Sequence, residues 1–466
     1  MKNTLAQRSA AAIGAVLIAV LPLAPPAAAI PPPVIDPAVD IAPPDTDPAP
    51  AWPMKQTTVC NTSAVLADSQ FDSIPASAAF GVDDLHNFAR GDGQIVAVID
   101  SGVQPVSRLP RLRGGGDYIM SGDADSKGLS DCDHHGTLIA GIIAAAPSPN
   151  DKFIGVAPGA EIISIRQTSA AFGEENPPQG RTEADRSAAN LMTLAKSIVH
   201  AANLGATVIN LAVTACVDAG NPVDLRSLAG ALHYAAVDKN IVIVAAAGNT
   251  GGQTCQPNPG YDPANPGDPR NWDGVVSVSL PSYFSDLVLS VAGSDLTGAP
   301  YVNTMPGPWV GVAAPAMNMV SLDPTEPTPG ALTNAALVKG VPTPLNGTSF
   351  ATAYVSGLAA LIREKHPELT ARQVINRIIA TAHTPAEGLN NTLGAGIVDA
   401  TAALTADVPK GDPIAPGVPS AKLPPPAPAP PPDHTARNAA LIAVGSALAV
   451  LVVIGLTVFA VRKSSA

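Results

Sequence analysis

Buried strands and amphipathic helices alternate along the middle of the chain. Four apolar runs predict strands: 94–103, 161–168, 207–213 and the run that begins at Ile241. Apolar residues also recur at helical spacing from Leu191 to Ala202, and Gly205 is expected to end that helix. Near-continuous apolar strands that alternate with helices predict an α/β fold, in which a mostly parallel sheet is covered by helices on both faces.

Further helices are expected around and after that sheet, at 224–237, 350–365 and 370–382. Thr370 precedes the last of these helices and is expected to be its N-cap, because a threonine side chain can accept a hydrogen bond from a free N–H of the first turn. We therefore expect the main folded domain to span 80–405.

The N-terminal region has the pattern of an exported protein. Lys2 and Arg8 precede or enter an apolar stretch, and small residues follow it, which predicts a secretory signal peptide at 1–29. An uncleaved anchor is the alternative. The next segment, 30–79, is an extension whose first part is rich in Pro and Ala and too poor in large apolar residues to pack a core. We expect that first part to be extended and polyproline-like.

The C-terminal region has the pattern of a linker and a membrane anchor. A Pro/Ala-rich linker at 406–438 precedes 439–461, which contains no charged residue. That segment is long enough to cross a bilayer core of about 30 Å as one transmembrane helix. Arg462 and Lys463 follow at once, so 462–466 is expected to be a cytoplasmic tail and the main domain to face the extracytoplasmic side of the cell membrane.

Composition and charge narrow the possible functions. With 466 residues and 46% apolar content, the chain can bury a large core. The formal net charge of −12 argues against nucleic acid as a partner, because proteins that bind it are usually basic.

Three short motifs carry candidate chemistry. Asp100 stands at the end of an apolar strand, His135 precedes a Gly-Thr pair at the start of a helix, and Ser349 follows Asn-Gly-Thr at the start of another. Each motif alone also fits a simple strand end or helix cap. Together, an acid, a histidine and a serine in that chain order have the arrangement of the subtilisin triad.

The chain therefore resembles the subtilisin-like serine proteases. The resemblance implies that Ser349 is the nucleophile, that His135 is the general base, and that Asp100 orients the imidazole. His135 is preferred to its neighbour His134, which is expected to face solvent, because the family pattern is a histidine followed directly by Gly-Thr. Asn249, in the Ala-Gly-Asn turn after an apolar strand, is expected to stabilise the oxyanion; a turn cap is the alternative.

A branch of that family is indicated by the whole architecture. A Pro-rich extension that contains Cys60, the lead-in Asp131-Cys132-Asp133, Ala353 in place of the usual proline after the serine, and a C-terminal anchor are similar to the mycosins. Mycosins are membrane-anchored subtilisin-like proteases of type VII secretion systems. This resemblance implies an endopeptidase that processes secreted protein substrates and associates with the secretion membrane complex.

The four cysteines are expected to form two disulfides, because an exported chain meets an oxidising compartment. Three pairings are possible. We favour Cys60 with Cys132, which would pin the extension beside His135, and Cys216 with Cys255, which would flank a substrate-side loop. Zinc is the rival interpretation, but no Cys-x-x-Cys or histidine cluster accompanies the cysteines, and no metal or cofactor is predicted.

Other classes of function remain as alternatives. The chain could be mainly a structural, complex-stabilising subunit with incidental proteolysis. A soluble degradative enzyme fits the predicted anchor less well. The specificity pocket is expected to lie between 211–214 and 246–248, whose small residues indicate no clear side-chain preference.

Overall fold

The computed structural model describes residues 30–220, 223–251, 255–325, 330–412, 443–444 and 446–457. The chain divides into two compact units, Met1–Val418 and Pro419–Ala466. The predicted signal peptide, most of the predicted linker and the predicted tail lie outside the described residues, as does part of the predicted span 439–461. Residues 446–457 are helical and exposed. Counted over the described residues, no helix combines the length and the apolar character needed to cross a membrane.

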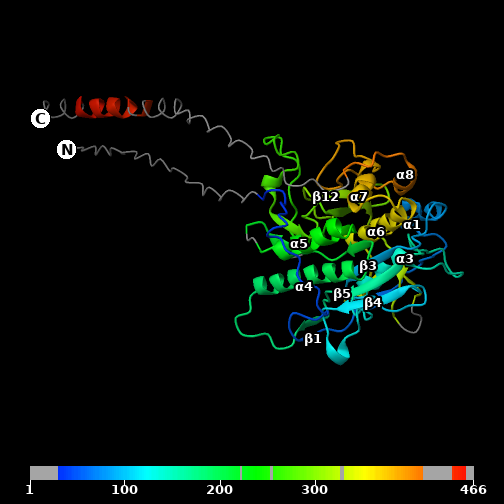
Figure 1. Ribbon diagram of the computed structural model, residues 1–466. Helices are drawn as coiled ribbons and strands as arrows, with labels where there is room; N and C mark the ends of the chain where they lie inside the picture. The colour runs from blue at the N-terminus through cyan, green and yellow to red at the C-terminus, as the bar shows by residue number, and fades with distance from the viewer. Residues whose placement is uncertain are drawn as a thin grey trace, which may run out of the picture. The chain divides into compact units, whose positions relative to one another are not determined.

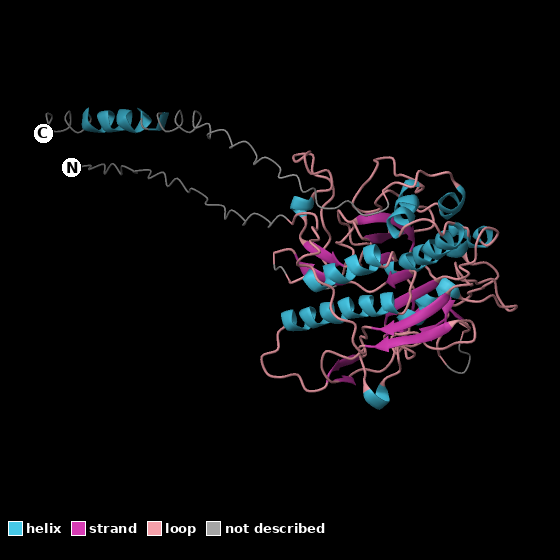
Figure 2. Ribbon diagram, in the orientation of Figure 1, coloured by secondary structure: helices cyan, strands magenta, loops and turns pink. Residues whose placement is uncertain are grey.

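In the described part of the first unit, seven strands form a central parallel sheet with the order β12-β11-β9-β7-β3-β5-β4 (Figure 2). The predicted mainly parallel sheet is therefore confirmed. In chain order its strands are β3 (Ile95–Asp100), β4 (Leu112–Asp117), β5 (Glu161–Arg166), β7 (Val208–Leu211), β9 (Val242–Ala246), β11 (Val288–Ser294) and β12 (Val310–Pro315).

Helices cover both faces of this sheet. Successive side chains of a strand point to opposite faces, so one strand contributes to the hydrophobic clusters on both faces. Val96 and Val98 of β3 belong to one hydrophobic cluster, and Ala97 and Ile99 belong to the other. Figure 1 labels most of the helices that contribute to these clusters. The first cluster takes in α1 (Pro75–Phe80), α2 (Val82–Leu85), α3 (His135–Ala144), α6 (Thr348–Lys365), α7 (Ala371–Ala380) and α8 (Ala400–Thr405). The second takes in α4 (Glu183–Asn203) and α5 (Arg226–His233).

The helix boundaries mostly follow the sequence signals. Thr370 caps α7 as expected, because its side chain accepts the N–H of Gln373 in a reciprocal capping box. The helix predicted at 224–237 is present over 226–238, but it is not a regular α-helix throughout. It is a shorter α5 followed by a π-helical turn, η2 (Tyr234–Asp238), in which the N–H of Lys239 donates to the carbonyl of Tyr234.

Small antiparallel sheets and short helical turns surround the central sheet. The sheets are β1 (Met54–Gln56) with β6 (Phe172–Glu174), β8 (Ala215–Asp218) with β10 (Ser277–Leu280), β13 (Ser321–Leu322) with β14 (Leu332–Thr333), and β2 (Ser63–Ala64) with β15 (Ala335–Val338) and β16 (Val341–Pro344). The turns are η1 (Gly122–Ala124) and η3 (Trp272–Gly274).

The Pro-rich extension lies against the surface of this first unit and packs no core of its own. The Tyr283 hydroxyl donates to the carbonyl of Pro31 at 2.9 Å. Farther along, the Asp45 carboxylate contacts His200 and Asn203 of α4, each at 2.8 Å. A Cβ on Gly230 of α5 would lie 2.4 Å from the backbone of the extension, so the glycine permits this close approach. Whether the segment is polyproline-like stays a prediction.

Candidate active site

Asp100 and His135 form a hydrogen-bonded pair at the end of a central strand. Asp100 ends β3 and is completely buried, and its Oδ1 accepts the N–H of Ser101 at 2.7 Å. His135 opens α3, and its Nδ1 donates to the same Oδ1 at 2.8 Å. The His135 side chain is 29% exposed. One ring nitrogen is therefore held by a buried carboxylate.

The charges around His135 favour its protonated form. Burial lowers the pKa of the imidazole, but the charge and hydrogen bond of Asp100, with smaller contributions from Asp131 and Asp133, raise it above the ordinary value overall. A base in this setting can accept a proton during a reaction, because the resulting imidazolium is stabilised by fixed negative charge.

Gly136 allows α3 to approach the end of β3. A Cβ on this residue would lie 2.0 Å from the carbonyl oxygen of Gly102 and 3.2 Å from the Cβ of Asp100. Any side chain would therefore push the start of α3 away from Asp100. This close approach explains why the residue after His135 is glycine.

Ser349 and Asn249 both lie close to Gly347. Ser349 lies in the first turn of α6 and is 5% exposed. Asn249 follows β9, and its Oδ1 accepts the N–H of Thr348 at 3.1 Å, which orients the amide. A Cβ on Gly347 would lie 3.2 Å from Ser349 Oγ and 3.8 Å from Asn249 Nδ2. The hydroxyl and the amide nitrogen therefore flank the same point.

The elements that carry the four predicted residues come together at one edge of the sheet. Phe350, next to Ser349, contacts the ring of His135 with 5.9 Å between the ring centroids. Asp100 and Asn249 follow the ends of parallel strands, and such ends share one edge of the sheet. A serine, a histidine held by a buried acid, and an amide donor are the groups that acyl transfer requires.

A family model described as "Subtilase family" matches residues 91–396 of the chain. The chain belongs to the subtilase family. It is a serine endopeptidase, as the resemblance implied.

Within this family the chain is similar to the mycosins. Mycosin-1 of Mycobacterium tuberculosis (strain ATCC 25618 / H37Rv) is 47% identical over 431 residues, which cover 91% of this chain and 94% of that protein. A solved structure of a serine protease, MycP1, described as an essential component of the type VII (ESX-1) secretion system, is 48% identical with a TM-score of 0.76; it covers 81% of this chain and 100% of that chain. A chain of an intact ESX-5 inner membrane complex is 44% identical with a TM-score of 0.78. The match covers 93% of this chain and 100% of that chain.

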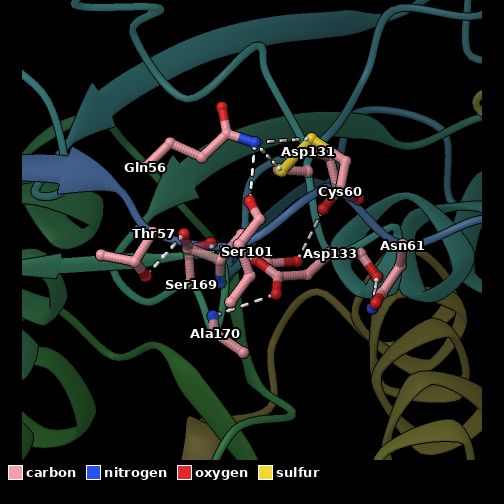
Figure 3. The surroundings of a disulfide bond; sticks show 12 residues. Gln56, Thr57, Cys60, Asn61, Ser101, Asp131, Asp133, Ser169 and Ala170 are labelled. Carbon is pink, nitrogen blue, oxygen red and sulfur yellow. Dashed lines mark hydrogen bonds between the residues drawn. A yellow bond between two sulfur atoms is a disulfide. The ribbon is translucent and has the colours of Figure 1, made fainter.

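Both predicted disulfides are present in this subtilase. Cys60 pairs with Cys132, and Cys216 pairs with Cys255. In Figure 3 the amide of Gln56 points at the two sulfurs of the first bridge, and Nε2 lies 3.6 and 3.7 Å from them. The first bridge therefore ties the extension to the turn that leads into His135.

The prediction that His134 faces solvent is wrong. Its side chain is half-buried, and Nδ1 lies 3.0 Å from the Ser63 hydroxyl of β2. Burial lowers the pKa of this imidazole. The reason is that the extension, anchored by Cys60, passes over the turn before α3.

Asp131 and Ser101 carry no role in the sequence-based prediction, yet they lie directly behind the subtilase site. Asp131 is buried and accepts the Ser101 hydroxyl at 2.8 Å, and the Ser101 oxygen accepts the N–H of Gly136 at 2.9 Å. The available signals were an acid one helical turn before His135 and a hydroxyl directly after Asp100. Over the same described residues, no group of three or more His, Cys, Asp or Glu side chains is arranged to hold a metal ion.

Proposed function

We propose that Asp100, His135 and Ser349 form the catalytic triad of a membrane-anchored endopeptidase. The observation that carries this proposal is the Asp100–His135 hydrogen bond, set beside the start of the helix that bears Ser349. A serine hydroxyl is a weak nucleophile at neutral pH and needs an adjacent base. The raised pKa of His135 fits that task.

The reaction follows from these roles. Ser349 Oγ attacks the carbonyl carbon of the scissile peptide bond while His135 Nε2 takes the hydroxyl proton. The protonated His135 then gives that proton to the leaving amine, and the C–N bond breaks to leave an acyl-enzyme. Water attacks the acyl group with the same base, which releases the acid product and restores Ser349. Asp100 stays ionised and stabilises the imidazolium throughout.

The developing oxyanion is received by two donors. One is the Asn249 Nδ2 amide, whose orientation is supported by the bonds from Thr348 to Oδ1. The other is the Ser349 N–H, one of the free donors in the first turn of α6. Such preorganised donors are worth about 10²- to 10³-fold in kcat, a magnitude measured in a related subtilisin.

The substrate is an extended protein segment. Residues 211–214 and 246–248 follow or end two neighbouring parallel strands, β7 and β9, and we propose that they line the specificity pocket. Their small side chains fit a pocket without a charged or strongly selective wall.

The protein is exported and anchored on the extracytoplasmic side of the cell membrane. The signal pattern at 1–29, the uncharged stretch at 439–461 and the basic residues that follow it support this orientation. The relatives support a place in a type VII secretion membrane complex, because one of them is a component of the ESX-1 system and another is part of an ESX-5 inner membrane complex.

A second candidate function is stabilisation of that complex, with incidental proteolysis. It is favoured by the match to one chain of an intact membrane complex. The match covers the whole length of that chain. The two functions make different predictions for a protein that keeps its fold and loses its nucleophile.

Ser349→Ala in the producing organism separates them. Intact masses of the secreted proteins are compared between wild type, Ser349→Ala and the control Ser121→Ala, which alters an exposed serine outside the site. We expect at least one secreted protein to keep its unprocessed mass only in Ser349→Ala, while the assembled membrane complex persists on a native gel. Identical masses in all three strains would contradict the proteolytic role. Loss of the complex on deletion of the whole chain, but not in Ser349→Ala, would support the additional structural role.

A further inference from the structure

Asp131 is a buried acid that the proposed reaction does not use. It is 6% exposed and its carboxylate accepts hydrogen bonds from three donors. These are the Ser101 hydroxyl at 2.8 Å, the Thr137 N–H at 2.8 Å and the Thr137 hydroxyl at 2.6 Å. A buried carboxylate is costly unless it is fully hydrogen-bonded, so this arrangement calls for a reason.

The donors come from both sides of the Asp100–His135 pair. Ser101 directly follows Asp100 on the strand side, and Thr137 lies in the first turn of α3, just after His135. Ser101 Oγ also accepts the N–H of Gly136 at 2.9 Å. The N–H groups of residues 136 and 137 are free donors of a helix start, and here the Ser101–Asp131 pair accepts both of them. Figure 3 shows Ser101 and Asp131 beside the Cys60 bridge.

We infer that Asp131 is a positioning residue that fixes His135 against Asp100 through Ser101 and Thr137. The inference rests on the proposed triad. Without Asp131, the Asp100–His135 bond and the Gly136 N–H bond to Ser101 Oγ would remain, but Ser101 and Thr137 would lose the acceptor that they share. A displacement of about 1 Å in a catalytic group can cost about 10²-fold in rate.

A neighbouring acid provides the matched control. The carboxylate of Asp133 lies in the same turn but accepts from Ser169 Oγ and from the N–H of Ala170, in the loop after β5, and the structure gives it no bond to Ser101 or Thr137. Asp131 and Asp133 both raise the pKa of His135 through their charge. Replacing either acid therefore removes a nearby charge. Only the replacement of Asp131 also removes the carboxylate that links Ser101 to Thr137.

The protonation state of Asp131 decides the pH at which the Asp131 and Asp133 variants should be compared. Burial raises the pKa of this carboxyl to about 6, against the hydrogen bonds from Thr137 and Ser101 that favour the charged form, and the charge of Asp100 adds to the increase. Asp100 and His135 are the titratable groups nearest to it in this network. On the alkaline plateau of the rate profile, at pH values above the transitions of both groups, differences in rate reflect position and not titration.

The test measures phosphonylation of the full-length chain by a fluorophosphonate probe on that alkaline plateau. We expect Asp131→Asn to lower the rate at saturating probe (kinact) by about 10- to 100-fold with little change in the probe's KI, because the geometry of the base is lost and the cleft is not. Asp133→Asn should keep a kinact close to that of wild type. Both variants should move the acid limb of the pH profile to lower pH, because each loses a charge that raises the pKa of His135.

Ser101→Ala keeps the inference testable if Asp131→Asn does not fold. It should lower kinact in the same way, and in combination with Asp131→Asn the two losses should be less than additive, because both break one linkage. A kinact for Asp131→Asn and Ser101→Ala equal to that of Asp133→Asn would overturn the positioning role while leaving the triad in place. Failure of the wild-type chain to react with the probe would instead overturn the proposed function.

Discussion

The two helix starts that build the site are held in different ways. Around Ser349, the first four turns of α6 are buried without interruption in the core, so the proposed nucleophile is fixed by packing. Around His135, the side chain is partly exposed, and the turn before it is held by Asp131 and by the Cys60 bridge to the extension. Both helices pack into the core, because α3 is also buried from Gly136 to Ala144. The histidine half differs in that specific tethers hold the turn before its helix.

This difference matters because the two kinds of support fail differently. A buried helix start moves only if the core around it rearranges, whereas a tethered turn loses its geometry when one hydrogen bond or covalent link is removed. The histidine half should therefore be the more sensitive to substitutions outside the reacting groups.

The largest effect is expected when the histidine half is broken at its acid. Asp100→Asn should reduce kcat by about 10⁴-fold, because the amide holds His135 in the wrong tautomer and no longer stabilises its charged form. The measurement is hydrolysis of fluorescently labelled casein, with the thermal unfolding midpoint as the control for folding. A rate within tenfold of wild type would show that Asp100 does not orient the base.

A smaller effect is expected when the serine half loses its amide donor. Asn249→Ala should reduce kcat by about 10²- to 10³-fold with little change in KM, because the donor acts on charge that develops only in the transition state. The same casein assay checks this. A fall in affinity with unchanged kcat would place Asn249 in substrate binding instead.

The serine half could be predicted from the sequence, and the histidine half only in part. The turn before Asn249 and the helix after Ser349 are local patterns that packing reinforces, and in the histidine half the same holds for the apolar strand before Asp100. Both disulfide pairs also followed from the expected position of the loops. The hydrogen bond between Asp131 and Ser101 could not be predicted from the sequence. Ser101 lies on a different element, and no local pattern fixes which side chains meet across such a distance.

The extension and the helix at 224–237 also show what local sequence patterns cannot predict. The low apolar content of residues 30–53 predicted that this segment forms no core, but not that Asp45 would contact His200 or that Ser63 would cover His134. In the π-helical turn after α5 the backbone bonding shifts, as in the bond from the N–H of Lys239 to the carbonyl of Tyr234, and side-chain periodicity does not reveal such a shift.

The two disulfides allow a prediction about stability, and the Cys60–Cys132 bridge belongs to the histidine half. Each closes a long loop, with sequence separations of 72 for Cys60–Cys132 and 39 for Cys216–Cys255. Replacing either pair by serines should lower the free energy of unfolding by about 4 kcal/mol, as estimated from loop entropy. Denaturant unfolding measures the loss, and kcat should fall less than in Asn249→Ala because the hydrogen bonds at each half remain. A loss below about 1 kcal/mol for both pairs would contradict the estimate.

The smallest effect is expected in the pH dependence. The pKa of His135 is raised above its ordinary value of about 6.5, so the acid limb of kcat/KM should have its midpoint above about pH 6.5. The stability that His135 contributes changes with pH in the opposite direction to the rate. The protonated imidazole contributes stability that is complete below about pH 6.5 and lost as the pH rises through the folded-state pKa. Rate and unfolding profiles of the same preparation check both signs, and a midpoint below 6 would contradict the stabilising role of the neighbouring acids.

Mapping the fluorophosphonate adduct tests the central claim, that the two halves act together as one triad, most directly. The full-length chain is labelled, digested and analysed by peptide mass in three forms: wild type, His135→Ala and the neighbouring control His134→Ala. The account predicts an adduct on Ser349 in wild type and in His134→Ala, and its loss in His135→Ala, because without that base the hydroxyl is not activated. An adduct on a different serine, or labelling of Ser349 that survives His135→Ala and is lost in His134→Ala, would contradict it.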